Sequence, residues 1–152
     1  MMLTEKQTSL IKDLQSQEKL CIDKYAFYTG QAKDTELKSL FQTIQKAEQQ
    51  HYHSLSQVLN GTVPAVQPGD SQGANYKPTA TYTAGCNASD KEQDQFLCTD
   101  SITTEKYVSS AYNDDLFQFG DSNIRKLLND IQTEEQNHAE MIYKYKQVNG
   151  MV

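Results

Sequence analysis

The sequence repeats itself at an interval of 87 residues, and this repeat limits the chain to a fold with two similar halves. Between residues 18 and 51 the first half aligns with the second without a gap. The matched pairs include Glu18 with Glu105, Tyr25 with Tyr112, Glu48 with Glu135 and His51 with His138. Helical composition raises chance agreement, but it does not explain paired Glu, Tyr and His residues. We therefore expect two copies of one structural unit.

Apolar side chains three and four positions apart predict two helices in each half. In the second helix the pattern comprises Leu37, Leu40, Phe41 and Ile44, and in the fourth it comprises Ile124, Leu127, Leu128 and Ile131. Residue types that commonly cap helix N-termini stand before the predicted helices, at Thr4, Asp34, Ser89 and Asp121. We predict helices near residues 4–31, 35–59, 89–118 and 122–147.

The stretch between the halves, residues 60–88, is predicted to be a long irregular connection. It contains all three prolines and four of the seven glycines of the chain. The connections inside the halves are short, so each half should be an antiparallel helix hairpin. Two hairpins joined by a long crossover form the ferritin-like type of four-helix bundle. We therefore predict an all-α, ferritin-like antiparallel four-helix bundle made of two repeated helix hairpins, with residues 1–152 in a single domain.

Glutamate and histidine occupy positions of the predicted core that would ordinarily be apolar. They interrupt the apolar stripe of every predicted helix, at Glu18, Glu48, His51, Glu105, Glu135 and His138. Burying several carboxylates together is costly, and no lysine or arginine lies on these stripes to compensate. One Glu from each of two helices with Glu-x-x-His from the other two is a pattern that binds two metal ions. We predict such a site, holding Fe or Mn, with Zn also compatible.

The turn positions place these residues at one level of the bundle. Residues equally far from the turn of an antiparallel hairpin lie opposite each other. The midpoint between Glu18 and Glu48 is Lys33, and the midpoint between Glu105 and Glu135 is Gly120. Both midpoints fall in predicted turns, so each single glutamate should face the Glu-x-x-His of its own hairpin.

The six positions and their order along the helices resemble the ferritin-like superfamily, which includes bacterioferritins and rubrerythrins. The resemblance implies terminal ligands at Glu18 and Glu105 and bridging ligands at Glu48 and Glu135. It implies that His51 and His138 bind one metal each. It also implies that Tyr25 and Tyr112, two helical turns further along the same faces, hydrogen-bond a ligand carboxylate.

Both halves also resemble the coat F family of bacterial spore coat proteins. The points of likeness are Leu10, Asp13-Leu14, Glu18-Lys19, Tyr25, Phe41, Glu48-Gln49-Gln50-His51 and the closing Asn149-Gly150. The likeness covers most of the chain except the linker. It implies assembly into the spore coat, with coat proteins or a second copy of the chain as partners.

The bulk properties exclude other classes of partner. A net charge of -6 argues against nucleic acid binding. No segment approaches the roughly 20 apolar residues that a membrane span requires, and the first residues do not resemble a signal peptide. Three irregularly spaced cysteines fit a reducing compartment better than a disulfide framework. We expect a cytoplasmic protein with no nucleic acid or membrane partner.

Three functions remain open. The first is a di-metal oxidase or peroxidase, in which a reduced di-iron or di-manganese centre reacts with oxygen or peroxide. The second is a structural spore coat component whose metal site only stabilises the bundle. The third is an iron oxidase or iron store of the rubrerythrin or bacterioferritin type. Two expectations count against standard forms of the third function: there is no fifth helix, and there is no Cys-x-x-Cys pair for an attached electron donor.

Overall fold

The computed structural model describes residues 2–65 and 71–152, and these residues form helices and loops without any strand. The helices are α1 (Glu5–Gln31), α2 (Thr35–Leu59), α3 (Gln72–Asn75), α4 (Ala88–Leu116) and α5 (Ser122–Val148). All four predicted long helices are present, within two residues of the expected bounds. The prediction of an irregular linker over 60–88 was wrong in one respect, because the short helix α3 lies within it. Residues 66–70 of that linker lie outside the described residues.

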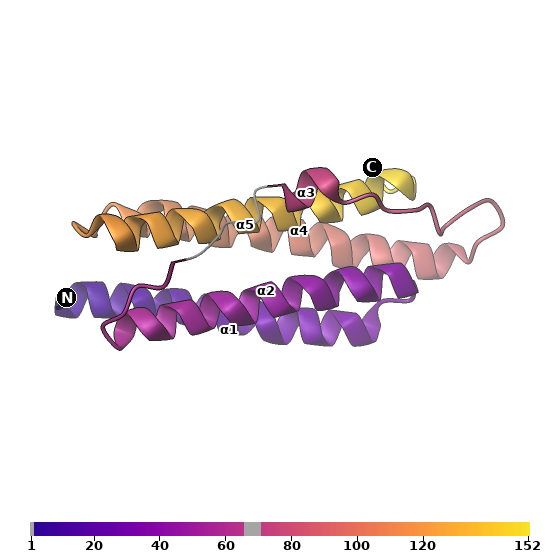
Figure 1. Cartoon of the computed structure of the whole chain (residues 1–152). Helices are drawn as coiled ribbons and strands as arrows, with labels where there is room; N and C mark the ends of the chain where they lie inside the picture. Colours follow the sequence, from indigo (N-terminus) through magenta and orange to yellow (C-terminus); the bar gives the residue numbers. More distant parts are fainter. Residues whose placement is uncertain (1, 66–70) are drawn as a thin grey trace.

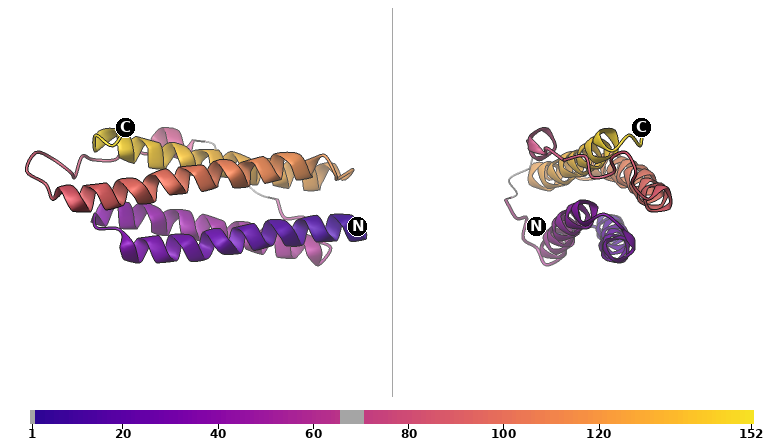
Figure 2. Two further views of the ribbon diagram at one scale, coloured as in Figure 1. Left: turned by 180° about the vertical axis from the view of Figure 1, so that it is seen from behind. Right: turned by 90° about the vertical axis from the view of Figure 1, so that its right-hand side faces the viewer.

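The long helices pack in two pairs, α1 with α2 and α4 with α5 (Figure 1). The pairs meet through contacts of α2 with α5 and of α1 with α4, and the end-on view shows one pair stacked on the other (Figure 2). The chain termini lie at opposite ends of the long axis (Figure 1). The two repeated hairpins of the sequence are therefore the two packed pairs of the structure.

Three of the four predicted N-caps are confirmed. Thr4 forms a capping box with Gln7, and the side chains of Asp34 and Asp121 accept hydrogen bonds from the first turns of α2 and α5. The prediction for α4 was wrong, because Asn87 rather than Ser89 caps it by accepting from the Asp90 amide. Asparagine is as good an N-cap as serine, and it starts the helix earlier.

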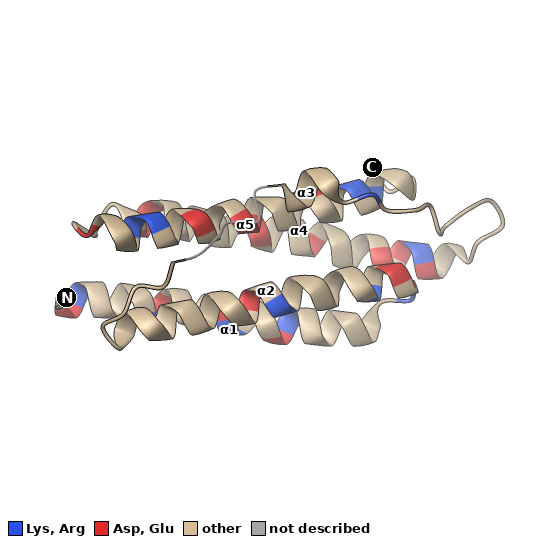
Figure 3. Ribbon diagram, in the orientation of Figure 1, with Lys and Arg blue, Asp and Glu red and all other residues tan. Residues whose placement is uncertain are grey.

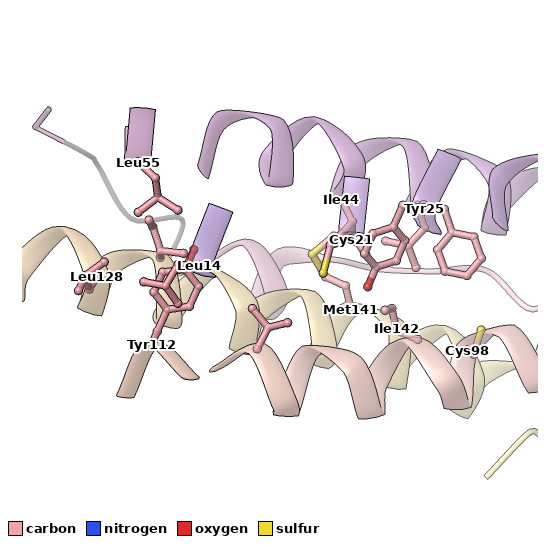
Figure 4. Packing of buried hydrophobic residues seen from close by; sticks show 14 of the residues in the cluster. Leu14, Cys21, Tyr25, Ile44, Leu55, Cys98, Tyr112, Leu128, Met141 and Ile142 are labelled. Atoms are coloured by element: carbon pink, nitrogen blue, oxygen red, sulfur yellow. The ribbon is translucent and has the colours of Figure 1, made fainter. Parts of the chain in front are cut away.

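The core follows the apolar stripes and fills the space between the two pairs. Figure 4 shows Leu14, Leu55, Tyr112 and Leu128 gathered at one place along the axis and Cys21, Tyr25, Ile44, Met141 and Ile142 at another. All of these side chains are buried. Burying one large apolar side chain stabilises a fold by about 1.5–3 kcal/mol. Apolar packing along both pairs therefore offsets the free-energy cost of burying polar residues in the same core.

The linker is tied to the helices by specific hydrogen bonds. The Gly73 amide donates to Asn137 on α5, while Lys144 donates to the Gly73 carbonyl. Further along, buried Asp94 accepts hydrogen bonds from the Tyr82 hydroxyl and from the Lys33 amide in the α1–α2 turn. The described part of the crossover is thus held on α5 through Gly73 and on α4 through Tyr82.

The surface charge is mixed. Figure 3 shows lysine and arginine scattered among acidic residues along the long helices. Among the described residues, no helix is long and apolar enough to cross a membrane.

Candidate metal centre

The structure brings all six predicted ligand residues together between the two helix pairs. Every one of the long helices contributes: Glu18 from α1, Glu48 and His51 from α2, Glu105 from α4, and Glu135 and His138 from α5. All six are at most 2% exposed. Each single glutamate lies at the same level of the bundle as the Glu-x-x-His of its own hairpin, as the turn midpoints predict.

The side chains form two overlapping groups. One consists of Glu18, Glu48, His51 and Glu135, and the other of Glu48, Glu105, Glu135 and His138. Within each group, one ligand atom from every residue lies within 4.8 Å of the others. Glu48 and Glu135 belong to both groups, and each of the remaining residues belongs to one. Such a division into shared and unshared side chains is compatible with two neighbouring metal positions.

Both histidines turn the same ring nitrogen toward the carboxylates. Nδ1 of His51 lies 2.9 Å from Glu135 Oε1 and 3.5 Å from Glu18 Oε1. Nδ1 of His138 lies 3.0 Å from Glu48 Oε1 and 3.6 Å from Glu105 Oε1. Nδ1 of each histidine thus lies closest to the shared glutamate of the opposite helix pair.

Many polar atoms of the centre are buried without a hydrogen-bond partner. These atoms include both carboxylate oxygens of Glu48 and Glu135, one oxygen each of Glu18 and Glu105, and Nδ1 of both histidines. The close contacts of the two Nδ1 atoms therefore lack hydrogen-bonding geometry. Buried polar atoms in native proteins are almost always paired. A set of unpaired oxygens and imidazole nitrogens directed at one another fits the ligand chemistry of Fe, Mn or Zn.

The glutamates respond to burial and to one another. Burial, followed by the negative charge of Glu135, raises the pKa of Glu48 and of Glu105 well above its ordinary value. Burial acts in the same direction on Glu135, but contacts with Glu105 and the two histidines hold its pKa well below the ordinary range. Without a cation, the centre is therefore compensated by protons on some of its own ligands.

The histidines take part in this compensation. Burial alone would lower the pKa of His51 and His138, but the negative charges and close contacts of the surrounding glutamates raise it well above its ordinary value. No lysine or arginine among the described residues forms an ion pair with the six side chains. Metal ions bound here would have to displace these protons.

The two predicted tyrosines each hydrogen-bond a glutamate of the centre. The hydroxyl of Tyr25 donates to Glu105 at 2.5 Å, and that of Tyr112 donates to Glu18 at 2.6 Å. Both bonds cross from one helix pair to the other, since Tyr25 shares α1 with Glu18 and Tyr112 shares α4 with Glu105. The tyrosines thus connect the pairs and fix the orientation of the two unshared carboxylates.

One contact of the centre was missed in the sequence. Glu134 hydrogen-bonds Nε2 of His51, the ring nitrogen that faces away from the carboxylates. Its counterpart in the repeat is Ala47, so the two halves differ at this position. The replacement of an alanine by a glutamate directly before the shared glutamate was the available signal.

Cys21 lies beside the centre but is not among the grouped side chains. Burial, followed by the charges of Glu48 and Glu135, raises the pKa of its thiol far above the usual value. The thiol therefore stays protonated and behaves as a small apolar side chain.

Comparison with known families gives a match in the C-terminal part of the chain. The family model of the Coat F domain matches residues 93–152, which include most of α4 and all of α5. No curated protein and no solved structure matches the chain. Glu105, Glu135 and His138 lie in the matched part, whereas the other three site residues lie in the hairpin related to it by the repeat. The second helix pair is therefore similar to the Coat F domain.

Proposed function

We propose that this chain is a ferritin-like di-metal carboxylate protein of the spore coat F type, with Glu18, Glu48, His51, Glu105, Glu135 and His138 as its metal ligands. The proposal rests chiefly on the two buried groups that share Glu48 and Glu135. Burying their unpaired oxygens and nitrogens carries a large desolvation cost unless a cation compensates it. The helix order and the crossover link fit the ferritin-like arrangement.

In this proposal each residue has a definite task. Glu48 and Glu135, which belong to both groups, would serve both ions, while Glu18 with His51 and Glu105 with His138 would each hold one ion. Tyr25 and Tyr112 hold the unshared carboxylates in place through their hydrogen bonds. A pair of Fe or Mn ions would supply redox chemistry with oxygen or peroxide.

A structural role is the second candidate, and the match to the Coat F domain favours it. In a spore coat component the ions would replace the protons that compensate the carboxylates and so stabilise the packing of one helix pair on the other. Both candidates place the protein in sporulating cells and in the coat.

Elemental analysis of the purified protein tests the metal site directly. We expect close to two Fe, Mn or Zn ions per chain and none in the double variant Glu48→Ala, Glu135→Ala. The matched control replaces two exposed glutamates, Glu5→Ala with Glu92→Ala, and should retain the ions. Protein that stays metal-free after incubation with each ion, with unchanged thermal stability, would refute the site.

The two candidates differ in turnover. Metal-loaded protein that consumes oxygen or peroxide supports the redox function, whereas loaded protein that consumes neither is a structural metal protein. Absence of the protein from purified spores would contradict the assignment to the coat.

A further inference from the structure

The two histidines of the centre are equivalent in the repeat but not in their surroundings. Nε2 of His51 hydrogen-bonds the carboxylate of Glu134. Nε2 of His138 is buried and has no hydrogen-bond partner among the described residues. The ring edges that face the shared glutamates are alike, so the difference lies entirely on their outer edges.

A single position in the sequence causes this difference. Glu134 immediately precedes the shared ligand Glu135 on α5, and Ala47 immediately precedes Glu48 on α2. The repeat that relates His51 to His138 also relates Glu134 to Ala47, so a methyl group stands where His138 would find its partner. Both positions are partly buried, and the Glu134 side chain is 17% exposed.

A carboxylate behind a metal-bound imidazole has a known physical effect. It accepts a hydrogen bond from the outer N–H, fixes the ring orientation and makes the inner nitrogen a stronger ligand for the metal. Removing such a partner typically lowers metal affinity by about 10–100-fold. Nδ1 of both histidines faces the shared glutamates, so Nε2 is the outer nitrogen that a second carboxylate can hydrogen-bond.

We infer that the two metal positions are unequal, and that Glu134, as a positioning residue acting through His51, makes the His51 position the tighter one. This inference rests on the proposed function. The inner ligands contribute equally, because each position combines one histidine, one unshared glutamate and the same two shared glutamates. The affinities of the two positions should therefore differ by the contribution of the Glu134 contact, about 10–100-fold.

Titration of the metal-free protein with Co(II) tests the inference, because the visible absorption of Co(II) reports its ligands. Wild-type protein should bind two ions in two separate steps. Glu134→Ala should weaken the first step by about 10–100-fold, change the spectrum of the first-bound ion and leave the second step in place. Glu134→Gln keeps an acceptor oxygen without the charge and should give a smaller loss.

Two further variants separate this contact from a general effect of charge. Glu140→Gln removes a half-exposed carboxylate from the same helix and should change neither step. Ala47→Glu supplies the missing counterpart beside His138 and should bring the second step closer to the first. The helicity of each metal-free variant, measured by circular dichroism, verifies that it folds.

The possible failures are distinguishable. Wild-type protein that binds no Co(II), Fe(II) or Mn(II) overturns the proposed function and the inference with it. Wild-type protein that binds two ions with equal affinity overturns the inference alone. The inference also fails if Glu134→Ala weakens both steps equally, or if neither Glu134→Ala nor Ala47→Glu alters the ratio between them.

Discussion

Replacing Glu48, a proposed shared metal ligand, with glutamine should stabilise the metal-free protein while preventing metal binding. Burial, followed by the charges of Glu135 and Glu18, raises the pKa of Glu48 well above its ordinary value. A carboxyl group with a raised native pKa contributes its full stability only below the unfolded-state pKa of about 4.3. That contribution is lost as the pH rises through the native pKa. The metal-free protein should therefore become less stable from mildly acidic to mildly alkaline pH, and Glu48→Gln should reduce this loss.

The separation of the ligand atoms sets the magnitude. Two unit charges 4.8 Å apart repel by about 3.5 kcal/mol at an effective dielectric constant of about 20. A buried amide donor without a partner costs about 1–3 kcal/mol, which offsets part of the gain in Glu48→Gln. At about pH 8 we expect a net stabilisation of about 1–2 kcal/mol. At about pH 5, keeping the Glu48 carboxyl protonated in the native state costs wild type only about 1 kcal/mol. The gain from Glu48→Gln is then no larger than the cost of its buried amide, so the two cancel.

Thermal unfolding in the presence of a chelator, followed by circular dichroism, measures this effect. For a chain of this length 1 kcal/mol corresponds to about 2–4 °C, so Glu48→Gln should melt about 2–8 °C above wild type at about pH 8. Adding Mn(II) should raise the melting temperature of wild type and leave that of the variant unchanged. The exposed control Glu92→Gln should follow wild type throughout. A Glu48→Gln protein that is less stable than wild type at both pH values would refute the reasoning.

Three further outcomes can be checked. Tyr112→Phe removes the hydrogen bond to Glu18 and should cost the metal-loaded protein about 1.5–3 kcal/mol in thermal unfolding; an unchanged melting temperature would contradict the role of the hydroxyl. Asp94→Ala leaves two turn amides and the Tyr82 hydroxyl without their acceptor, so proteolysis should cut the linker faster than in wild type. The pKa values of the centre's histidines are raised, so Mn(II) binding should release protons, and the affinity for Mn(II) should increase from about pH 5 to about pH 8. Calorimetry in buffers of different ionisation enthalpy measures this proton release. Binding without proton release would contradict these protonation states.

The long helices and their pairing could be predicted from the sequence because both depend on local signals. The apolar stripe of α2 and the cap at Asp34 specify where that helix lies and which face is buried. The short helix α3 could not be predicted in this way. It has no apolar stripe and no side-chain cap, and it is held by contacts with Asn137 and Lys144, which are distant in sequence.

The centre was predictable for a different reason. Glutamate and histidine on an apolar stripe are costly enough that a folded chain retains them together only when something compensates. The 87-residue repeat then predicted that the three residues of each half lie at one level of the bundle. By contrast, the crossed hydrogen bonds of Tyr25 and Tyr112 depend on how one helix pair stacks on the other, which the stripes do not specify. The same holds for the contact between Glu134 and His51.

The outer surroundings of the two halves differ more than their buried ligands do. The six proposed ligand residues repeat because each hairpin contributes the same side chains to one centre. Residues just outside the centre are free of that requirement: position 134 holds a glutamate where position 47 holds an alanine, and the linker hydrogen-bonds Asn137, next to His138. If the proposed site is correct, a repeated fold can thus make its two metal positions unequal without changing any of the six proposed ligands. Comparing the two steps of metal binding therefore tests the outer contacts, whereas total metal content tests only the repeated ligands.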